Sequence, residues 1–307
     1  MSIATRTPAR SALSPSPPAP QRGAPAASDA KVNAREFDFG DRDFRRVCEL
    51  IYERAGIALA DGKRDMVYGR LSRRLRALGI ASFRQYLDQL ESTTGGDEWQ
   101  AFTNALTTNL TAFFREPHHF DTLREDLGRY AGRGLVNLWS CAASTGEEPY
   151  SMAITACEAY GTLDPPVRIV ATDIDTQVLA TAARGVYPLE RISGLDDTLR
   201  RRYFQRGAGS NEGTCRVNPA LRQLIDFRPL NLLAPRFDVN GPFTAVFCRN
   251  VMIYFDKPTQ RGILTRLVPH LADEGMLYTG HSENYLHAAD VIVPCGRTLY
   301  RRAGTLA

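Results

Sequence analysis

Two strongly polar residues follow an apolar run in the segment FCRNVMIYFD, residues 247–256. Arg249 and Asn250 stand directly after Cys248, where an unpaired buried charge or amide would cost roughly several kcal/mol. If the run is a central strand of a parallel sheet, Asn250 emerges at its carboxyl end, where open α/β sheets bind ligands. We therefore expect a ligand to pair with Asn250, and Tyr254 to face the same cleft.

Two other segments have residues that suit a nucleotide cofactor. SCAASTGEEP, residues 140–149, combines small residues with Gly146 for a turn and a helix start near Glu147, whose free N–H groups suit an anion. Asp173, in ATDID, would end another strand, where a carboxylate can accept hydrogen bonds from two ribose hydroxyls. The motif G-x-G-x-x-G is missing, so the first segment alone is a weak signal.

Each of these residues also has a purely structural interpretation. Glu147 and Glu148 could complement the dipole of a helix N-terminus. Asp173 or Asp175 could equally well cap the following helix, and Tyr254 could be a core residue with a satisfied hydroxyl. The residues by themselves leave these alternatives open.

The segment LTTNLTAFFRE, residues 106–116, is apolar but carries three separated polar residues. These are Asn109, Thr111 and Arg115. Helical spacing would put Thr111 and Arg115 on one face. A surface ion pair is the alternative role for Arg115.

The elements that would position these residues follow from hydrophobic periodicity. Four compact apolar runs alternate with helical patterns, at residues 135–140, 167–173, 243–248 and 275–280. This alternation predicts a mostly parallel sheet covered on both faces, and the run at 291–302 suits a closing strand or hairpin. Roughly forty residues more than a crossover needs separate the second and third runs, so we expect an antiparallel β-subdomain inserted at 188–230.

The region before the sheet divides into three parts. Residues 1–35 are rich in Pro, Ala and Ser, and we expect a disordered tail there. Residues 36–110 show short amphipathic helical patterns, the first stopping at Gly56, and predict a small α-helical domain. Residues 111–133 would be a linker that contributes to the active site, and 134–307 the α/β domain.

The composition restricts the class of protein. With 43% hydrophobic and 23% charged residues, the 307-residue chain can build a packed core. Its six cysteines lack C-x-x-C pairs and metal-ligand spacing, so we expect reduced thiols in a cytosolic protein and no metal site. No apolar run reaches membrane-spanning length, and a signal-peptide core is missing at the N-terminus.

Five motifs, in this order, resemble those of the chemotaxis receptor methyltransferases, the CheR family: TTNLTAFFRE, WSCAASTGEEPYS, ATDID, PLNLL and FCRNVMIYFD. The match runs from about Phe37 to Arg302. The resemblance implies an all-α domain joined to a Rossmann-like, S-adenosylmethionine-dependent methyltransferase domain with an inserted antiparallel β-subdomain. It implies methyl transfer from S-adenosylmethionine to glutamate side chains of methyl-accepting chemoreceptors, which gives glutamyl 5-O-methyl esters and S-adenosylhomocysteine.

The resemblance also implies roles for matching residues. The cofactor contacts would be Asn109, Thr111, Arg115, Glu147, Asp173, Asn231, Leu232, Arg249 and Asn250. Asp173 would take the ribose hydroxyls and Glu147 the methionyl ammonium group, while Arg115 and Tyr254 would be the catalytic residues. A glutamate acceptor is already ionised at neutral pH, so no general base is required and we expect Arg115 to position the carboxylate.

The implied partners are chemoreceptors, and the sequence offers two contact regions for them. Arg70, Arg73, Arg74 and Arg76 resemble the basic helix thought to meet the acidic receptor bundle in this family, with a solvated face as the alternative. The loop 206–217 resembles family members that dock on a receptor's C-terminal peptide by β-augmentation. We expect a cytoplasmic monomer that binds no nucleic acid and does not insert into membranes.

Three rival functions differ from this one in testable ways. A nicotinamide dehydrogenase could also use a strand-end acid, but the missing glycine motif counts against it. A nitrogen methyltransferase is a nearer rival, because an Asn-x-x-x-Tyr pattern after a strand could serve an amine. A signalling adaptor that binds the cofactor without turnover is disfavoured by the joint presence of Arg115, Asp173, Asn250 and Tyr254.

Overall fold

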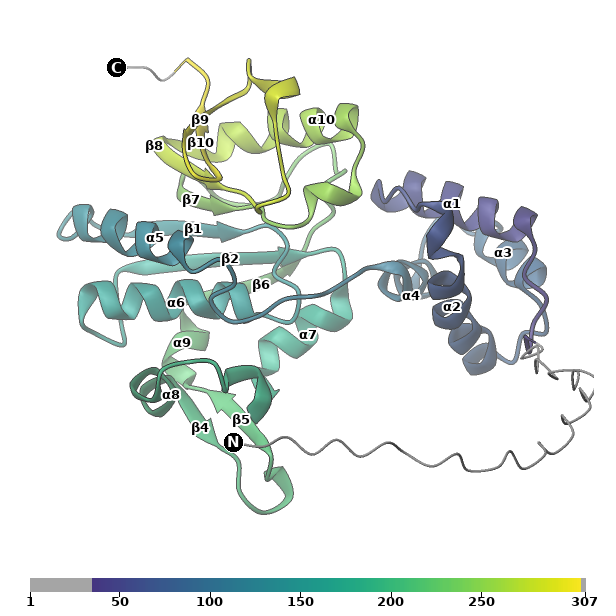
Figure 1. Ribbon diagram of the computed structural model, residues 1–307, viewed down its shortest axis with the longest axis horizontal. Helices are drawn as coiled ribbons and strands as arrows, with labels where there is room; N and C mark the ends of the chain where they lie inside the picture. The colour runs from purple at the N-terminus through teal and green to yellow at the C-terminus, as the bar shows by residue number, and fades with distance from the viewer. Residues whose placement is uncertain (1–34, 305–307) are drawn as a thin grey trace, which may run out of the picture. The chain divides into compact units, whose positions relative to one another are not determined.

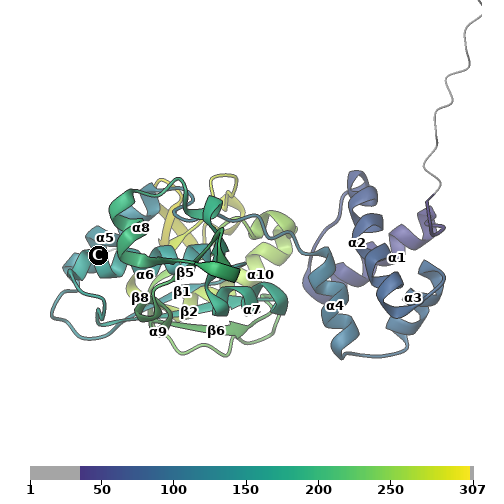
Figure 2. The ribbon, with the colours of Figure 1, turned by 90° about the horizontal axis from the view of Figure 1, so that it is seen from below.

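Four amphipathic helices at the beginning of the described chain, which spans residues 35–304, pack around one apolar core (Figure 2). They are α1 (Asp41–Ala55), α2 (Arg64–Leu78), α3 (Phe83–Glu91) and α4 (Asp97–Leu106). α1 stops at Gly56, as predicted, because that glycine adopts φ 69° and its N–H closes the last turn on the carbonyl of Tyr52. The tail predicted over 1–35 lies outside the described residues, apart from Arg35.

A seven-stranded sheet forms the centre of the larger domain in this computed structural model (Figure 1). Its strand order is β6-β2-β1-β7-β8-β10-β9, and β6, β2, β1, β7 and β8 run parallel. The bounds are β1 Val136–Ser140, β2 Val167–Asp173, β6 Ile225–Pro229, β7 Phe243–Phe247, β8 Leu271–Tyr278, β9 Ile292–Gly296 and β10 Leu299–Arg302. The predicted parallel sheet and its closing antiparallel hairpin, β9-β10, are confirmed.

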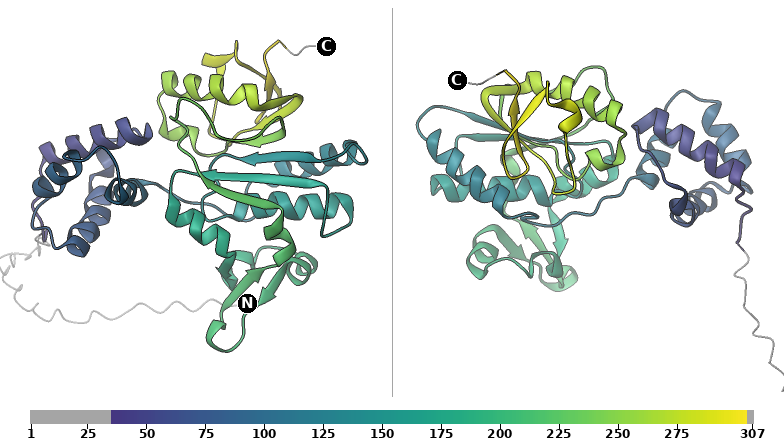
Figure 3. Two further views of the ribbon diagram at one scale, coloured as in Figure 1. Left: turned by 180° about the vertical axis from the view of Figure 1, so that it is seen from behind. Right: turned by 45° about the horizontal axis from the view of Figure 1, so that its top comes forward.

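Helices cover both faces of this sheet because successive side chains of each central strand point into different cores. In β1, Leu138 packs into the core shared with α5 (His118–Arg129), α6 (Glu147–Tyr160) and α7 (Thr176–Arg184). Its neighbour Trp139 packs into the core shared with α10 (Lys257–Leu267). Figure 3 shows α10 on the face opposite α6. The compact apolar runs in the sequence indicate strands that are buried on both faces, as these strands are.

The inserted subdomain is a three-stranded antiparallel sheet of order β3-β5-β4. Its strands are β3 (Val186–Pro188), β4 (Phe204–Arg206) and β5 (Thr214–Val217), accompanied by α8 (Asp197–Tyr203) and α9 (Pro219–Gln223). The boundary expected at 230 is wrong, because β6 pairs with β2 from Ile169↔Ile225 onward and belongs to the large sheet. Hydrophobicity does not reveal which sheet a short strand joins.

Several short 3-10 turns connect these elements. They are η1 (Asp61–Lys63), η2 (Leu189–Ile192), η3 (Gly209–Asn211), η4 (Met252–Tyr254), η5 (Val268–His270) and η6 (Leu286–Ala288). Hydrogen bonds tie the helical bundle to the sheet domain: Ala58 N–H donates to the Tyr254 carbonyl at 2.9 Å, and Gln100 donates to the Ile174 carbonyl at 2.8 Å. Within residues 35–304, no helix is long and apolar enough to cross a membrane.

Candidate functional site

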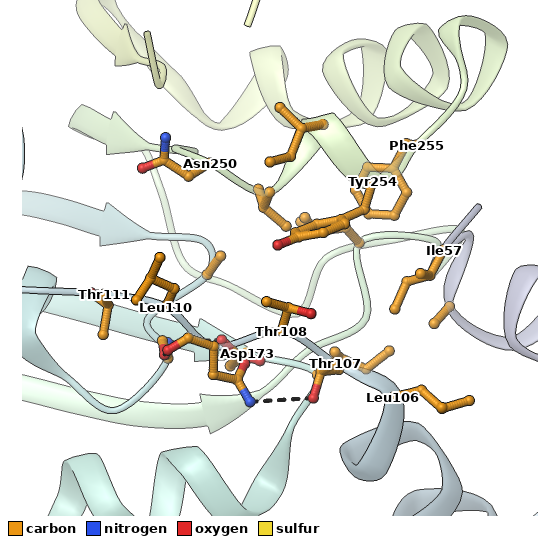
Figure 4. Close-up of a pocket in the computed structure, with 18 of the residues that line it drawn as sticks. Ile57, Leu106, Thr107, Thr108, Leu110, Thr111, Asp173, Asn250, Tyr254 and Phe255 are labelled. Carbon is orange, nitrogen blue, oxygen red and sulfur yellow. Dashed lines mark hydrogen bonds between the residues drawn. The ribbon is translucent and has the colours of Figure 1, made fainter. Parts of the chain in front are cut away.

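The carboxyl ends of β1, β2 and β7 open on one cavity of about 340 Å³. β1 pairs with β2 on one side and β7 on the other, so the cavity lies at the point where the chain switches direction across the sheet. Figure 4 shows Asp173, Asn250 and Tyr254 around this cavity. Nine of the ten predicted site residues line it, namely Asn109, Thr111, Arg115, Asp173, Asn231, Leu232, Arg249, Asn250 and Tyr254.

Asp173 is a buried carboxylate held by backbone donors at the end of β2. It accepts hydrogen bonds from the Ser144 N–H at 2.8 Å and the Asp175 N–H at 2.9 Å. Burial raises its pKa to about 6, against the opposing effect of those bonds. The capping role belongs to Asp175, which accepts from Gln177 N–H and Val178 N–H. Each Asp173 oxygen accepts one backbone hydrogen bond and can accept another, and the residue lines the cavity.

Glu147 is the tenth predicted residue and lies outside the cavity lining. It is fully buried at the first position of α6, and its Oε2 accepts a hydrogen bond from the Thr145 hydroxyl at 2.6 Å. Among the described residues, its Oε1 has no hydrogen-bond partner, and Arg191 Nη1 is 3.8 Å away. A buried carboxylate oxygen without a donor is costly, so this atom suits a cationic ligand group such as an ammonium.

Glu147 is reached through a loop with little freedom. Ser144 has φ 49° and Gly146 has φ 100°. A Cβ atom on Gly146 would lie 2.8 Å from both the Ala182 Cβ and the Tyr187 hydroxyl. The glycine is required at this turn because both its conformation and the space around it exclude a side chain.

Arg249 is paired by protein carboxylates. Its side chain is 1% exposed, with Nη1 3.0 Å from Glu148 Oε2 and Nη2 3.4 Å from Glu116 Oε2. Its guanidinium carbon also lies 5.7 Å from the ring centroids of Phe120 and Phe247. This arrangement resolves the polar interruption of the apolar run, because the charge is neutralised inside the fold.

Asn250 has the positive φ of 57° that short polar side chains tolerate. Its Nδ2 lies 3.4 Å from Glu116 Oε1, and Gly280 leaves room for it, since a Cβ there would stand 2.3 Å from that Nδ2. Glu283 fixes the loop that follows: its carboxylate accepts from Val251 N–H at 3.1 Å and Met252 N–H at 3.0 Å. Burial raises the pKa of Glu283 to about 7.

The segment between α4 and α5 is not helical, so the expected helical spacing of Thr111 and Arg115 is wrong. Side chains pull it into an extended path: the Thr107 hydroxyl and Asn109 Nδ2 both donate to Asp175 Oδ2, at 2.7 and 2.8 Å. The backbone turns at Phe114 and Glu116 with positive φ. Within residues 35–304, the side chain of Arg115 makes one hydrogen bond, from Nη1 to the Leu110 carbonyl at 2.9 Å, and no ion pair.

Tyr254 and Asn231 occupy the cavity wall nearest the helical bundle. Figure 4 shows the Tyr254 hydroxyl directed into the cavity, toward the wall formed by the 107–111 segment. Asn231 uses its side chain within the protein, donating to the Arg54 carbonyl at 2.8 Å and accepting from Leu233 N–H at 2.9 Å. Leu232 is buried, and its carbonyl accepts from Arg266.

Sequence reasoning missed several contributors to the cavity. Glu116 and Glu148 neutralise Arg249, and Glu283 holds the Asn250 loop. The helical domain supplies apolar wall residues including Ile57, Leu59 and Met66. Glu283 follows β8 and could have been found by inspecting the end of the fourth apolar run, as was done for the other strands. The helical-domain residues carry no such signal.

Comparison with known proteins gives consistent matches over most of the chain. Residues 109–300 match the family model described as "CheR methyltransferase, SAM binding domain", and residues 42–107 match "CheR methyltransferase, all-alpha domain". A chemotaxis protein methyltransferase of Escherichia coli is 54% identical over 260 residues, which is 85% of this chain and 90% of that protein. Chemotaxis protein methyltransferase 2 of Pseudomonas aeruginosa is 52% identical over 270 residues, 88% of this chain and 96% of the relative.

Proposed function

Because this chain belongs to the CheR methyltransferase family, we propose that it is a protein-glutamate O-methyltransferase acting on methyl-accepting chemoreceptors in the cytoplasm. The products are glutamyl 5-O-methyl esters and S-adenosylhomocysteine. One structural observation carries the proposal: Arg115, Asp173, Asn250 and Tyr254, which come from three separate segments of the sequence, line a single cavity at the switch point of the sheet.

The residues present fit S-adenosylmethionine. Asp173 offers a desolvated carboxylate for the ribose hydroxyls, and Glu147 offers an oxygen that accepts no hydrogen bond in the described residues for the methionyl ammonium group. Further contacts are assigned to Asn109, Thr111, Arg115, Asn231, Leu232, Arg249 and Asn250. When bound, this cofactor supplies an electrophilic methyl group on a sulfonium centre.

Arg115 and Tyr254 act on the acceptor. Arg115 donates charge-assisted hydrogen bonds to the glutamate carboxylate, using guanidinium N–H groups that the Leu110 carbonyl leaves free. The Tyr254 hydroxyl donates to the second carboxylate oxygen and fixes its orientation. The carboxylate is ionised at neutral pH, so the protein orients the nucleophile and excludes water and has no proton to remove.

The Arg249 guanidinium is better suited to a supporting role. Its two carboxylate partners and two aromatic rings hold it in place, and its Nη2 donates to the carbonyl of Arg115. Arg249 thereby fixes the backbone from which the Arg115 side chain projects.

Receptor contact is proposed at two further places. On α2, Arg73 and Arg76 are exposed. Arg70 donates to the Ala105 and Thr107 carbonyls, and Arg74 pairs with Glu98. A receptor's C-terminal peptide would add a strand to the three-stranded sheet, whose outer strands are β3 and β4.

A methylation assay tests this function. Membranes carrying chemoreceptors are incubated with the protein and S-adenosylmethionine labelled in its methyl group. We expect label on receptor protein that mild alkali releases as methanol. Alkali-stable label would indicate nitrogen methylation, and the absence of label, with cofactor binding intact by calorimetry, would favour an adaptor.

A further inference from the structure

An exposed leucine stands at the rim of the cavity. Leu110 lines the cavity, yet 76% of its surface is accessible. Ile253, another cavity-lining residue, is 49% exposed. Single exposed apolar side chains are common on protein surfaces, but two of them lining the same cavity offer an apolar surface that a partner could cover.

Two guanidinium groups are fastened to the same loop as Leu110. Arg115 Nη1 donates to the Leu110 carbonyl at 2.9 Å, and Arg191 Nη1 donates to the next carbonyl, that of Thr111, at 3.1 Å. The Arg191 side chain remains 42% exposed. The two arginines come from separate parts of the chain, and both donate to backbone carbonyls of the leucine-bearing loop. Arg191 Nη1 also lies 3.8 Å from the buried Oε1 of Glu147.

The loop itself is held in a defined shape. Asn109, the preceding residue, is anchored on Asp175 through its side chain, and its carbonyl accepts from the Ser144 hydroxyl at 3.1 Å. The exposed Leu110 is therefore presented by a backbone with fixed contacts on both sides. Such preorganisation reduces the entropy lost on binding.

We propose that Leu110, flanked by Arg115 and Arg191, is the docking contact for the receptor helix that carries the acceptor glutamate. Leu110 packs on an apolar residue of that helix, about one turn from the glutamate, and Ile253 extends this apolar contact. Arg115 takes the acceptor carboxylate, and Arg191 takes a second acidic side chain of the same helix. This inference rests on the proposed function, because it supplies that function with its substrate surface.

The kind of partner that fits this surface follows from its charge and shape. An apolar side chain between two cations complements an amphipathic helix that presents acidic residues beside an apolar stripe. Residue spacing of three or four on one helix face brings an apolar and an acidic side chain to adjacent positions. The cofactor is a poorer occupant for Leu110, since the residue is mostly in solvent.

The experiment measures receptor methylation at saturating S-adenosylmethionine, with chemoreceptor-bearing membranes as the varied substrate. Leu110→Ala should raise the KM for receptor about tenfold without changing the calorimetric dissociation constant of S-adenosylhomocysteine. Arg191→Glu should raise the same KM about fivefold, and its KM should depend less on salt than that of the wild type.

Matched controls separate docking from general surface effects. Leu286→Ala removes a leucine that is 81% exposed on η6, and Arg124→Glu reverses a charge that is 58% exposed on α5; both should keep the wild-type KM. An unchanged receptor KM for Leu110→Ala, or weaker S-adenosylhomocysteine binding instead, would overturn the docking contact while wild-type methylation upholds the proposed function. A wild-type protein that methylates no receptor would overturn both.

Discussion

The two arginines that line the cavity, Arg249 and Arg115, differ in whether the protein neutralises their charge. At the end of β7, Arg249 is 1% exposed and sits between Glu116 and Glu148. In the segment between α4 and α5, Arg115 is half-buried and donates to one carbonyl. The first charge is neutralised by the fold and the second remains available to a ligand.

This difference gives Arg249 a structural role and Arg115 a role in positioning the substrate. A buried ion pair that loses one partner leaves an uncompensated charge. Substitutions at the end of β7 should therefore lower the free energy of unfolding. A guanidinium that lacks a carboxylate partner can donate hydrogen bonds to a substrate. Substitutions in the 107–117 segment should therefore lower kcat.

The largest expected effect is on folding, from Arg249→Leu. This change leaves Glu116 and Glu148 without their cation and should lower the free energy of unfolding by about 3–5 kcal/mol, as measured by urea denaturation. Arg261→Leu is the matched control, because Arg261 and Asp290 form an ion pair at the surface and such pairs contribute little. Equal effects from both changes would contradict the buried role.

The next effect is on turnover, from Arg115→Ala. Removal of the positioning guanidinium should reduce kcat by ~10²-fold or more, with an unfolding midpoint close to that of the wild type. Arg115→Lys, which retains charge but not the planar fork, should recover only part of the rate. An unchanged rate at saturating cofactor would remove Arg115 from the mechanism.

A pH effect should arise on the β2 side of the cavity. Asp173, with its pKa raised to about 6, is protonated below that pH and ionised above it. If ribose binding needs the ionised form, affinity for S-adenosylhomocysteine should be constant above pH 7 and about tenfold weaker at pH 5. Asp173→Asn should bind more weakly and lose this dependence. A pH-independent wild-type affinity would show that the protonated acid serves equally well.

The smallest effect concerns the anchor of the 107–117 segment. Asn109→Ala removes one of two side-chain donors to Asp175 Oδ2, and Thr107 retains the other. We expect about 1 kcal/mol less unfolding free energy. Asn284→Ala, at an exposed asparagine that accepts from Leu286 N–H, should change the unfolding midpoint less. A larger loss in the control would show that the anchor is not special.

Sequence periodicity predicted the elements well because helices and strands depend on local patterns. α6 begins at Glu147 and β2 ends at Asp173, as the apolar runs indicate. The rule that ligands bind at strand ends predicted that Asp173, Asn250 and Tyr254 share one cleft, and all three line the cavity. The affiliation of β6 was missed because strand pairing joins segments by position in space.

By itself, the sequence determined the order of elements, the edge of the sheet that carries the site, and the motifs that mark the family. Only the tertiary structure decided which charges cancel: Arg249 meets Glu148, 101 residues away. It also decided the path of residues 107–109, where Asp175 accepts from Thr107 and Asn109 and the segment is not helical. The physical reason is that hydrophobic patterning acts between neighbours along the chain. Desolvated charges, in contrast, must be matched by whichever partner the completed fold brings within hydrogen-bonding distance.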